Sequence, residues 1–243
     1  MRPDASKKLA KVAPKKGPNP IIIGGVVAAL VIVAVVVAIV IGSAGKSGGP
    51  GGSAQPAGVT GGTGGGIVAN LTPAKSNAPT LDIYEDFQCP ACGDLEKRMG
   101  AEINEMAKAG EIKLVIHTLS FLDGNLKNDS STRSANAAAC AADAGKLLGY
   151  HSAVFAGMPA QEGTGYTDAQ LTEFATTAGI TGGAMTTWQK CASSGQHAEY
   201  VADVQTASEK AKVFNTPTVR LNGADFKTST AEALVAAVKA ATK

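Results

Sequence analysis

Three stretches with different hydrophobic patterns divide the chain. Residues 21–41 form an uninterrupted apolar run of 21 residues, long enough as a helix to span the roughly 30 Å apolar core of a bilayer. Residues 42–66 are rich in Gly, Ser, Pro and Ala and offer nothing from which a core could form, which predicts a flexible tether. From residue 67 onward, short apolar runs alternate with helical periodicity, which predicts one folded domain over residues 67–243.

The first part of this domain has the pattern of a strand–helix–strand unit. Residues 67–71 and 80–87 are predicted β-strands, and residues 112–119 are apolar enough for a central strand. Between them we predict a helix that ends at Gly110 and that joins two parallel strands by a right-handed crossover. Its apolar side chains recur at spacings of four, four and three residues, as expected of one buried helical face: Leu95, Met99, Ile103 and Met106.

Helical patterns dominate the middle of the domain, over residues 122–213. Thr167 and Gln170 have the spacing of a capping box, in which the two residues satisfy each other's backbone N–H groups at the start of a helix. The predicted helices cover residues 132–148, a segment that starts at Thr167, and residues 183–194 and 198–213.

The last part of the domain returns to strands. Residues 218–221 are a predicted strand, and Asn222-Gly223 is a strong signal for a two-residue hairpin turn. Ser229 and Glu232 are placed to cap a final helix. The predicted order is therefore β-α-β, a helical block, then β-β-α, which is an α/β fold.

Charge is unevenly distributed along the chain, whose net charge is only +2. The first 66 residues hold seven Lys or Arg and one acid, whereas the remainder holds 15 bases and 19 acids. A mildly acidic body argues against binding along a phosphate backbone, which requires clustered Lys and Arg.

Six of those bases precede the apolar run, so the positive-inside rule predicts a membrane topology. Residues 1–20 would be a cytoplasmic tail, residues 21–41 a single transmembrane helix, and everything after residue 42 extracytoplasmic. A cleaved signal peptide is the alternative, with Gly42-Ser43-Ala44 as the cleavage site, although its apolar region usually has about 7–15 residues. Either interpretation exports the domain to a compartment where disulfides persist.

The motif Cys89-Pro90-Ala91-Cys92 follows a predicted strand and begins a predicted helix. Free backbone N–H groups and the positive end of the helix stabilise a thiolate at Cys89, which lowers its pKa. Stabilising the thiolate favours the reduced form, so a disulfide between Cys89 and Cys92 becomes a stronger oxidant. We therefore predict that a substrate thiolate attacks Cys89, and that a second substrate thiol resolves the mixed disulfide.

Zinc binding and a structural disulfide are two other interpretations of this pair. Structural zinc requires four ligands, usually with a second close pair, and the other cysteines, Cys140 and Cys191, lie far apart, as do the three histidines, His117, His151 and His197. We therefore expect no metal. A purely structural Cys89–Cys92 disulfide would close a tiny loop and stabilise little. No nucleotide, flavin or haem signature is present, so no cofactor is expected.

The segment Glu85-Asp86-Phe87-Gln88-Cys89-Pro90-Ala91-Cys92, together with Thr216-Pro217-Thr218, resembles the DsbA-like branch of the thioredoxin superfamily over residues 67–243. The apolar run, the tether and the second cysteine pair are similar to the anchored actinobacterial members. The resemblance implies a thioredoxin fold, with a central mixed sheet and a helical insertion over about residues 122–213. It also implies that Cys89 is the exposed nucleophile and Cys92 its partner.

The resemblance further implies a cis peptide bond before Pro217, an uncommon and purposeful feature. Such a bond would turn the backbone of Thr216 toward Cys89, where a substrate chain could pair with it as a strand.

The chain departs from this family at one position. Many relatives carry a buried acid six residues before the first cysteine, where it assists proton transfer at the second; that position here is Ile83. Asp82, Glu85 and Asp86 are close, but none occupies it, so no proton relay is assigned. Pro90-Ala91 also lacks the histidine of the most oxidising relatives, and we expect a thiol pKa between about 3.5 and 7.

Assigning Cys89 and Cys92 to redox chemistry leaves Cys140 and Cys191 for each other, although four cysteines allow three pairings. A structural disulfide between them would close a loop of about 50 residues and contribute about 4 kcal/mol. The alternative is a relay pair that exchanges electrons with Cys89 and Cys92.

The predicted function is a thiol–disulfide oxidase that introduces disulfides into unfolded exported proteins bearing cysteines. The resemblance implies a membrane partner, a quinone-linked reoxidase of the DsbB or vitamin-K-epoxide-reductase type. A disulfide reductase or isomerase on the same scaffold is an alternative, as is a non-enzymatic, membrane-tethered binding domain with structural disulfides. The fold alone does not separate these functions.

Overall fold

The computed structural model describes residues 54–227 and 230–242. The predicted cytoplasmic tail, the predicted transmembrane helix and residues 42–53 of the predicted tether lie outside the described residues. Within the described part, no helix has the length and apolar character needed to cross a membrane.

A five-stranded mixed sheet forms the centre of the described domain, with the strand order β1-β3-β2-β4-β5. β2 and β3 are parallel, as the predicted crossover requires, and the other neighbouring pairs are antiparallel. The strands are β1 Ile67–Val68, β2 Thr80–Glu85, β3 Lys113–Thr118, β4 Thr218–Leu221 and β5 Ala224–Asp225. The α/β architecture is thus confirmed.

The helix that follows β2 contains an irregular turn that the sequence pattern did not predict. It runs as α2 (Pro90–Leu95), a π-helical segment η1 (Glu96–Gly100) and α3 (Ala101–Lys108). A Cβ atom on Gly100 would collide with the carboxylate of Glu96, so the missing side chain leaves room for Glu96 to fold back over this turn. The predicted apolar face is buried as expected. π-helical segments frequently occur at functional sites.

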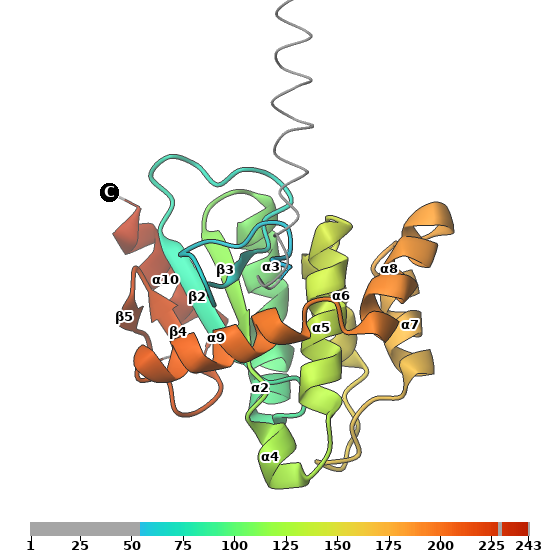
Figure 1. Cartoon of the computed structure of the whole chain (residues 1–243). Coiled ribbons are helices and arrows are strands. Elements are labelled where there is room, and N and C mark those ends of the chain that lie inside the picture. The colour runs from blue at the N-terminus through green and yellow to red at the C-terminus, as the bar shows by residue number, and fades with distance from the viewer. Residues whose placement is uncertain (1–53, 228–229, 243) are drawn as a thin grey trace, which may run out of the picture. The chain divides into compact units, whose positions relative to one another are not determined.

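The predicted helical insertion lies between β3 and β4, and most of its helices lie beside the sheet (Figure 1). One prediction within it is wrong: residues 132–148 are not one helix, because the chain turns at Gly145, whose φ of 65° favours glycine. The helices are α4 Leu122–Leu126, α5 Ser130–Asp143, α6 Leu147–Ala156, α7 Asp168–Thr177, α8 Gly182–Ser194 and α9 Ala198–Lys210.

A disulfide between Cys140 and Cys191 joins α5 to α8 within the insertion. Trp188, one turn before Cys191, donates its indole N–H to the carbonyl of Ala137 at 3.0 Å. These two links hold α5 and α8 together within the insertion.

Local capping and turn signals are mostly confirmed. Thr167 and Gln170 form the predicted capping box at the start of α7, and Asn222 and Gly223, both with positive φ, form the hairpin turn between β4 and β5. The last helix, α10 (Ala231–Ala241), is capped by Thr230 rather than by Ser229. The hydroxyl of Thr230 accepts the N–H of Ala233 at 3.2 Å, so the cap lies one residue later than predicted.

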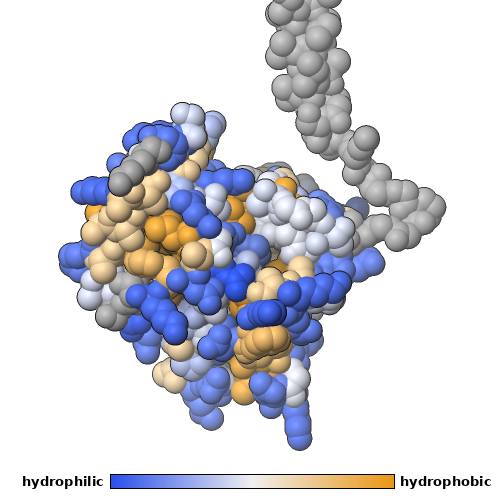
Figure 2. Space-filling view, turned by 90° about the vertical axis from the view of Figure 1, so that its left-hand side faces the viewer, coloured by the Kyte–Doolittle hydropathy of each residue, from blue (hydrophilic) through white to orange (hydrophobic). Residues whose placement is uncertain are grey.

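Helices cover both faces of the sheet. α9 crosses one face and α10 lies on the other (Figure 1), where Leu234 and Val238 of α10 enter the core. Figure 2 shows the side of the molecule with β5 and α10, where apolar surface lies in patches between hydrophilic side chains. Phe226 and Val235 are partly buried and pack against the core.

Candidate active site

The two cysteines lie where β2 gives way to the long helix. Cys89 is the residue that caps α2, Pro90 occupies the first helical turn, and Cys92 follows within that turn. Both side chains are free thiols. Cys89 is 8% exposed and Cys92 is fully buried, so Cys89 carries the accessible sulfur, although it is less open than the exposed nucleophile that the family resemblance implied.

A cis peptide bond joins Thr216 to Pro217 in the segment that leads into β4. This segment covers Cys89: the Sγ atom of Cys89 lies 3.6 Å from the carbonyl oxygen of Thr216. Contact with Thr216 accounts in part for the low exposure of Cys89. The structure therefore brings together all four residues that sequence analysis grouped at the redox site.

The surroundings of Cys89 stabilise its thiolate. A hydrogen bond from the Cys92 thiol is the largest cause and, with Thr216 and the backbone N–H groups of Cys92 and Ala91, it lowers the pKa of Cys89 to about 6, although burial opposes the shift. The sequence predicted this effect from the free backbone N–H groups and the positive end of the helix, without a contribution from Cys92.

The lowered pKa predicts how fast Cys89 is alkylated as pH changes. Because only the thiolate reacts, the rate of iodoacetamide modification of the reduced protein should rise with pH around a midpoint near 6. An unperturbed thiol would give a midpoint near about 8.5. The Cys92→Ala variant, which lacks the hydrogen-bonding thiol, should move the midpoint upward; an unchanged midpoint would contradict the assigned cause.

The insertion holds the loop that precedes Cys89. The carboxylate of Asp86 accepts a hydrogen bond from the hydroxyl of Ser131 in α5 at 2.6 Å. The side chain of Gln88 also bonds to Ser131, at 2.9 Å. From the segment before α7, the hydroxyl of Tyr166 donates to the carbonyl of Phe87 at 2.8 Å. Two segments of the insertion that are distant in sequence therefore position the cysteine pair.

Glu85 is a residue that sequence analysis set aside. It is 1% exposed, and its Oε2 atom lies 2.8 Å from Nε2 of His151 in α6. The charge of Glu85 raises the pKa of Cys92, and the charge of Cys89 raises the pKa of Glu85. A signal was available: Glu85 continues the alternate positions of Leu81 and Ile83 on β2, a row that faces the core. Ile83, the family's position for the acid, is an apolar core residue.

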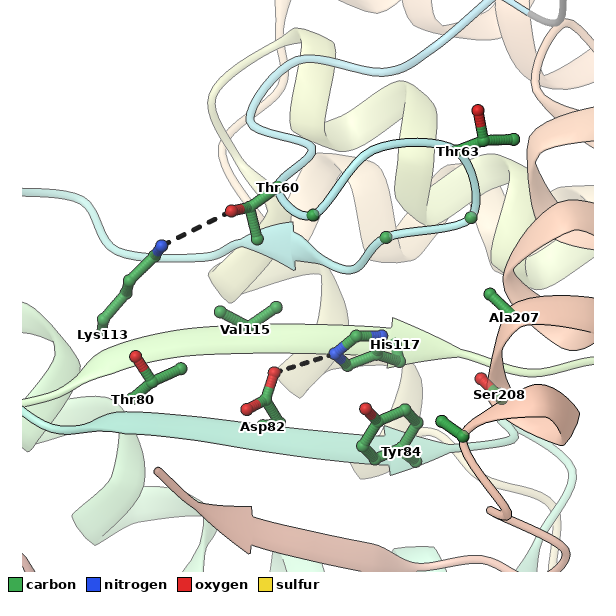
Figure 3. Close-up of a pocket in the computed structure, with 14 residues that line it drawn as sticks. Thr60, Thr63, Thr80, Asp82, Tyr84, Lys113, Val115, His117, Ala207 and Ser208 are labelled. Atoms are coloured by element: carbon green, nitrogen blue, oxygen red, sulfur yellow. Dashed lines mark hydrogen bonds and ion pairs between the residues drawn. The ribbon is translucent and has the colours of Figure 1, made fainter. Parts of the chain in front are cut away.

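His117, near the end of β3, lies on the opposite face of the sheet. Neighbouring residues of a strand point to opposite faces, so Tyr84 and its cross-strand partner His117 point away from Glu85. Figure 3 shows them in a pocket of about 350 Å³. There His117 Nε2 lies 3.0 Å from the Asp82 carboxylate, and its ring stacks on Tyr84. Neither cysteine lines this pocket.

Residues 74–240 match the family model described as thioredoxin, which is more than half of the chain. The chain belongs to the thioredoxin superfamily. Among solved structures, it is similar to the reduced disulfide bond oxidoreductase DsbG of Mycobacterium tuberculosis, with 30% identity and a TM-score of 0.59 over 70% of this chain and 86% of that one. These matches make it a DsbA-like thiol–disulfide oxidoreductase, an enzyme of the class that acts on substrate proteins.

Two further structures place this oxidoreductase within its superfamily. Oxidised DsbA of M. tuberculosis has 29% identity and a TM-score of 0.60, over 70% of this chain and 91% of that chain. MdbA of Actinomyces oris, a thiol-disulfide oxidoreductase, shares the fold with a TM-score of 0.66 at 20% identity, over 78% of this chain and 93% of that chain. A search of curated proteins found no match.

Two clusters in the described oxidoreductase domain bring three metal-binding side chains together. Cys140, Cys191 and His197 form one, but both sulfur atoms are committed to the disulfide. Glu85, Glu96 and His151 form the other. There the short contact between Glu85 and His151 is a hydrogen bond, which satisfies these atoms without an ion.

Proposed function

We propose that this oxidoreductase works as an oxidase, which introduces disulfides into proteins through the pair Cys89 and Cys92. The observation that carries the proposal is the stabilisation of the Cys89 thiolate by the Cys92 thiol. This stabilisation acts only in the reduced form, so it shifts the equilibrium toward reduced enzyme and oxidised substrate.

The reaction proceeds by two exchanges. A substrate thiolate attacks Cys89 of the oxidised pair; a bond forms between the two sulfurs, and Cys92 leaves as a thiolate that takes up a proton. A second substrate thiolate then attacks the substrate sulfur of this mixed disulfide. Cys89 leaves as a stabilised thiolate, the substrate holds a new disulfide, and the enzyme has gained two electrons.

Thr216 and the cis proline serve substrate binding in this proposal. An extended substrate segment would pair with the backbone at Thr216, next to the sulfur of Cys89. Phe214, two residues earlier, is 74% exposed, although large apolar side chains are usually buried. An exposed aromatic ring at this place suits unfolded chains, which expose apolar side chains.

The compartment and partners follow from the same function. We propose that the domain lies outside the cytoplasm, anchored by residues 21–41, and acts on unfolded exported proteins that bear cysteines. The disulfide between Cys140 and Cys191 supports an oxidising compartment. A quinone-linked membrane reoxidase, of the DsbB or vitamin-K-epoxide-reductase type, would remove the two electrons after each cycle.

The redox potential of the Cys89–Cys92 pair tests the oxidase against a reductase. We expect a value well above that of thioredoxin, about −270 mV, and closer to the isomerase and oxidase values of about −180 to −120 mV. Equilibration of the protein with glutathione buffers measures it, and oxidation of a reduced model protein checks the direction. A potential near that of thioredoxin would favour a reductase; no exchange by wild type would favour a binding domain.

A further inference from the structure

A buried histidine at the start of α9 has an acceptor facing each of its two ring nitrogens. His197 caps α9 and is 1% exposed. Its Nδ1 atom lies 2.6 Å from the carbonyl oxygen of Ala54, and its Nε2 atom lies 2.8 Å from Oδ2 of Asp143, the last residue of α5. A neutral imidazole carries one N–H group and donates to only one of these oxygens, whereas the protonated ring donates to both. The two contacts therefore indicate the protonated ring.

The carboxylate of Asp143 also binds the chain near Ala54. Its Oδ1 atom accepts the backbone N–H of Ala57 at 2.8 Å, so the N-terminal segment, defined here as residues 54–57, is attached at both of its ends. The histidine is itself fixed to α5, because its backbone N–H donates to Oδ1 of Asn136 at 2.8 Å. The segment is thus held at the end of α5 by a single ion pair and the bonds that surround it.

Asp143 is the acid that pairs with the ring of His197, and the other groups that contact the ring in the described domain are neutral. The sulfur atoms of Cys140 in α5 and Cys191 in α8 lie within 4.8 Å of a ring nitrogen, but they are joined in the disulfide and do not titrate. From the turn before α9, the amide of Gln196 lies 3.5 Å from Nε2. Burial lowers the pKa of His197, but the hydrogen bonds to its two acceptors and the charge of Asp143 outweigh burial, so the pKa is raised.

We propose that His197 is a pH-sensitive clamp, which holds the N-terminal segment on α5 while the ring is protonated and releases it when the ring loses a proton. The single N–H of the neutral ring stays on Nε2, because the carboxylate of Asp143 is the stronger acceptor. The lone pair of Nδ1 then faces the carbonyl oxygen of Ala54, and two acceptors repel each other at this short distance. The bond from Ala57 is exposed to solvent, where backbone hydrogen bonds open most readily.

The clamp determines from which end of the domain the chain leaves. α5 begins next to the redox pair, where Ser131 bonds to the carboxylate of Asp86. It ends at Asp143, about 18 Å away at 1.5 Å per residue. A closed clamp therefore fixes the N-terminal segment at the end of α5 that is remote from the redox pair. With the clamp open, the first attachment is Gly58, whose carbonyl accepts the N–H of Val68 at 2.9 Å.

The effect on the enzyme rests on the membrane anchor of the proposed function, residues 21–41. Opening the clamp adds the four residues of the N-terminal segment to the tether and extends its reach by up to about 13 Å. Because the pKa of His197 is raised in the folded state, the clamp is complete below about 6.5, the usual histidine value, and is lost as pH rises through the raised value. A rise in pH therefore widens the range of positions that Cys89 reaches around the anchor.

The test is an NMR titration of the full-length, ¹⁵N-labelled protein in detergent micelles, from about pH 5 to 9. The ring nitrogen shifts give the pKa of His197, which we expect above about 6.5. Solvent exchange of the Ala57 amide, corrected for the intrinsic effect of pH, reports release of the segment. It should accelerate by about tenfold or more at the same midpoint, the factor for a hydrogen bond to a charged group. The amide of Val68, which is bonded to Gly58, should show no such step.

Three variants separate the clamp from ordinary packing. His197→Phe keeps a ring in the buried position but has no N–H, so the Ala57 amide should exchange at the released rate at every pH. Asp143→Asn preserves size and removes the charge, so the pKa of His197 should fall below about 6.5, since burial then dominates. Asp82→Asn is the matched control, because Asp82 also bonds to a buried histidine, His117; it should leave the pKa of His197 unchanged.

Two results would overturn the clamp: an Ala57 amide that stays protected in wild type across the whole pH range, or an unchanged pKa of His197 in Asp143→Asn. The second does not depend on whether His197→Phe folds. Failure of the full-length protein to sediment with lipid vesicles would instead overturn the proposed anchor, because the exchange measurement does not require a membrane.

Discussion

The Cys89→Ser variant is expected to lose thiol–disulfide exchange by on the order of 10³-fold or more, the scale on which removal of a nucleophile acts. Cys89 is the less buried of the two sulfurs, and its pKa is lowered to about 6, so it supplies the reacting thiolate. The measurement is the rate at which the oxidised or glutathione-treated protein forms disulfides in a reduced model substrate.

Cys92→Ser gives a different result, which makes the assignment specific. Cys89 can still attack, but no second sulfur resolves the product, so a mixed disulfide with the oxidant should accumulate and be visible by mass. If Cys92→Ser were inert while Cys89→Ser formed the adduct, the roles of the two cysteines would be reversed. Both variants should keep the wild-type fold, because serine is close to cysteine in size.

Replacing both Cys140 and Cys191 by Ser should lower the free energy of unfolding by about 4 kcal/mol, the chain-entropy value for a loop of this length. The disulfide joins two helices across a sequence separation of 51 residues, so its loss frees the unfolded chain more than the folded one. Denaturant unfolding of the oxidised proteins measures this difference. Exchange activity at low temperature should stay close to wild type, because neither sulfur is committed to the redox pair.

The opposite result would favour the relay alternative for this pair. A double variant with unchanged unfolding free energy and lost activity would mean that electrons pass through Cys140 and Cys191. The double variant Cys89→Ser, Cys92→Ser is the matched control: it also removes two cysteines, but should lose activity and keep the disulfide's contribution to stability.

Alternation and spacing predicted the sheet and the redox pair because both depend on local sequence. The period of two in β2 placed Leu81 and Ile83 in the core, and Pro90 marked the start of the helix that carries Cys92. The hairpin turn at Asn222-Gly223 was predicted correctly for the same reason. These features are set by a few neighbouring residues, whatever the rest of the chain does.

The features that sequence analysis missed depend on contacts across the fold. The buried carboxylate of Glu85 is held by a hydrogen bond with His151, 66 residues away, a partner that no local pattern identifies. The π-helical turn keeps the same apolar spacing as an ordinary helix and differs only in how Glu96 and Gly100 approach each other. The strongest influence on Cys89 is likewise a side chain whose direction only the folded structure reveals.

The crosslink between α5 and α8 has a consequence for how the enzyme is made. A freshly synthesised chain begins with four thiols and must itself be oxidised once before its own helices are joined. Under the proposed function, mature copies are suited to supply that oxidation to newcomers. The enzyme would then form the structural disulfide in newly made chains of the same protein. The production of mature enzyme would therefore depend on molecules that are already folded and oxidised.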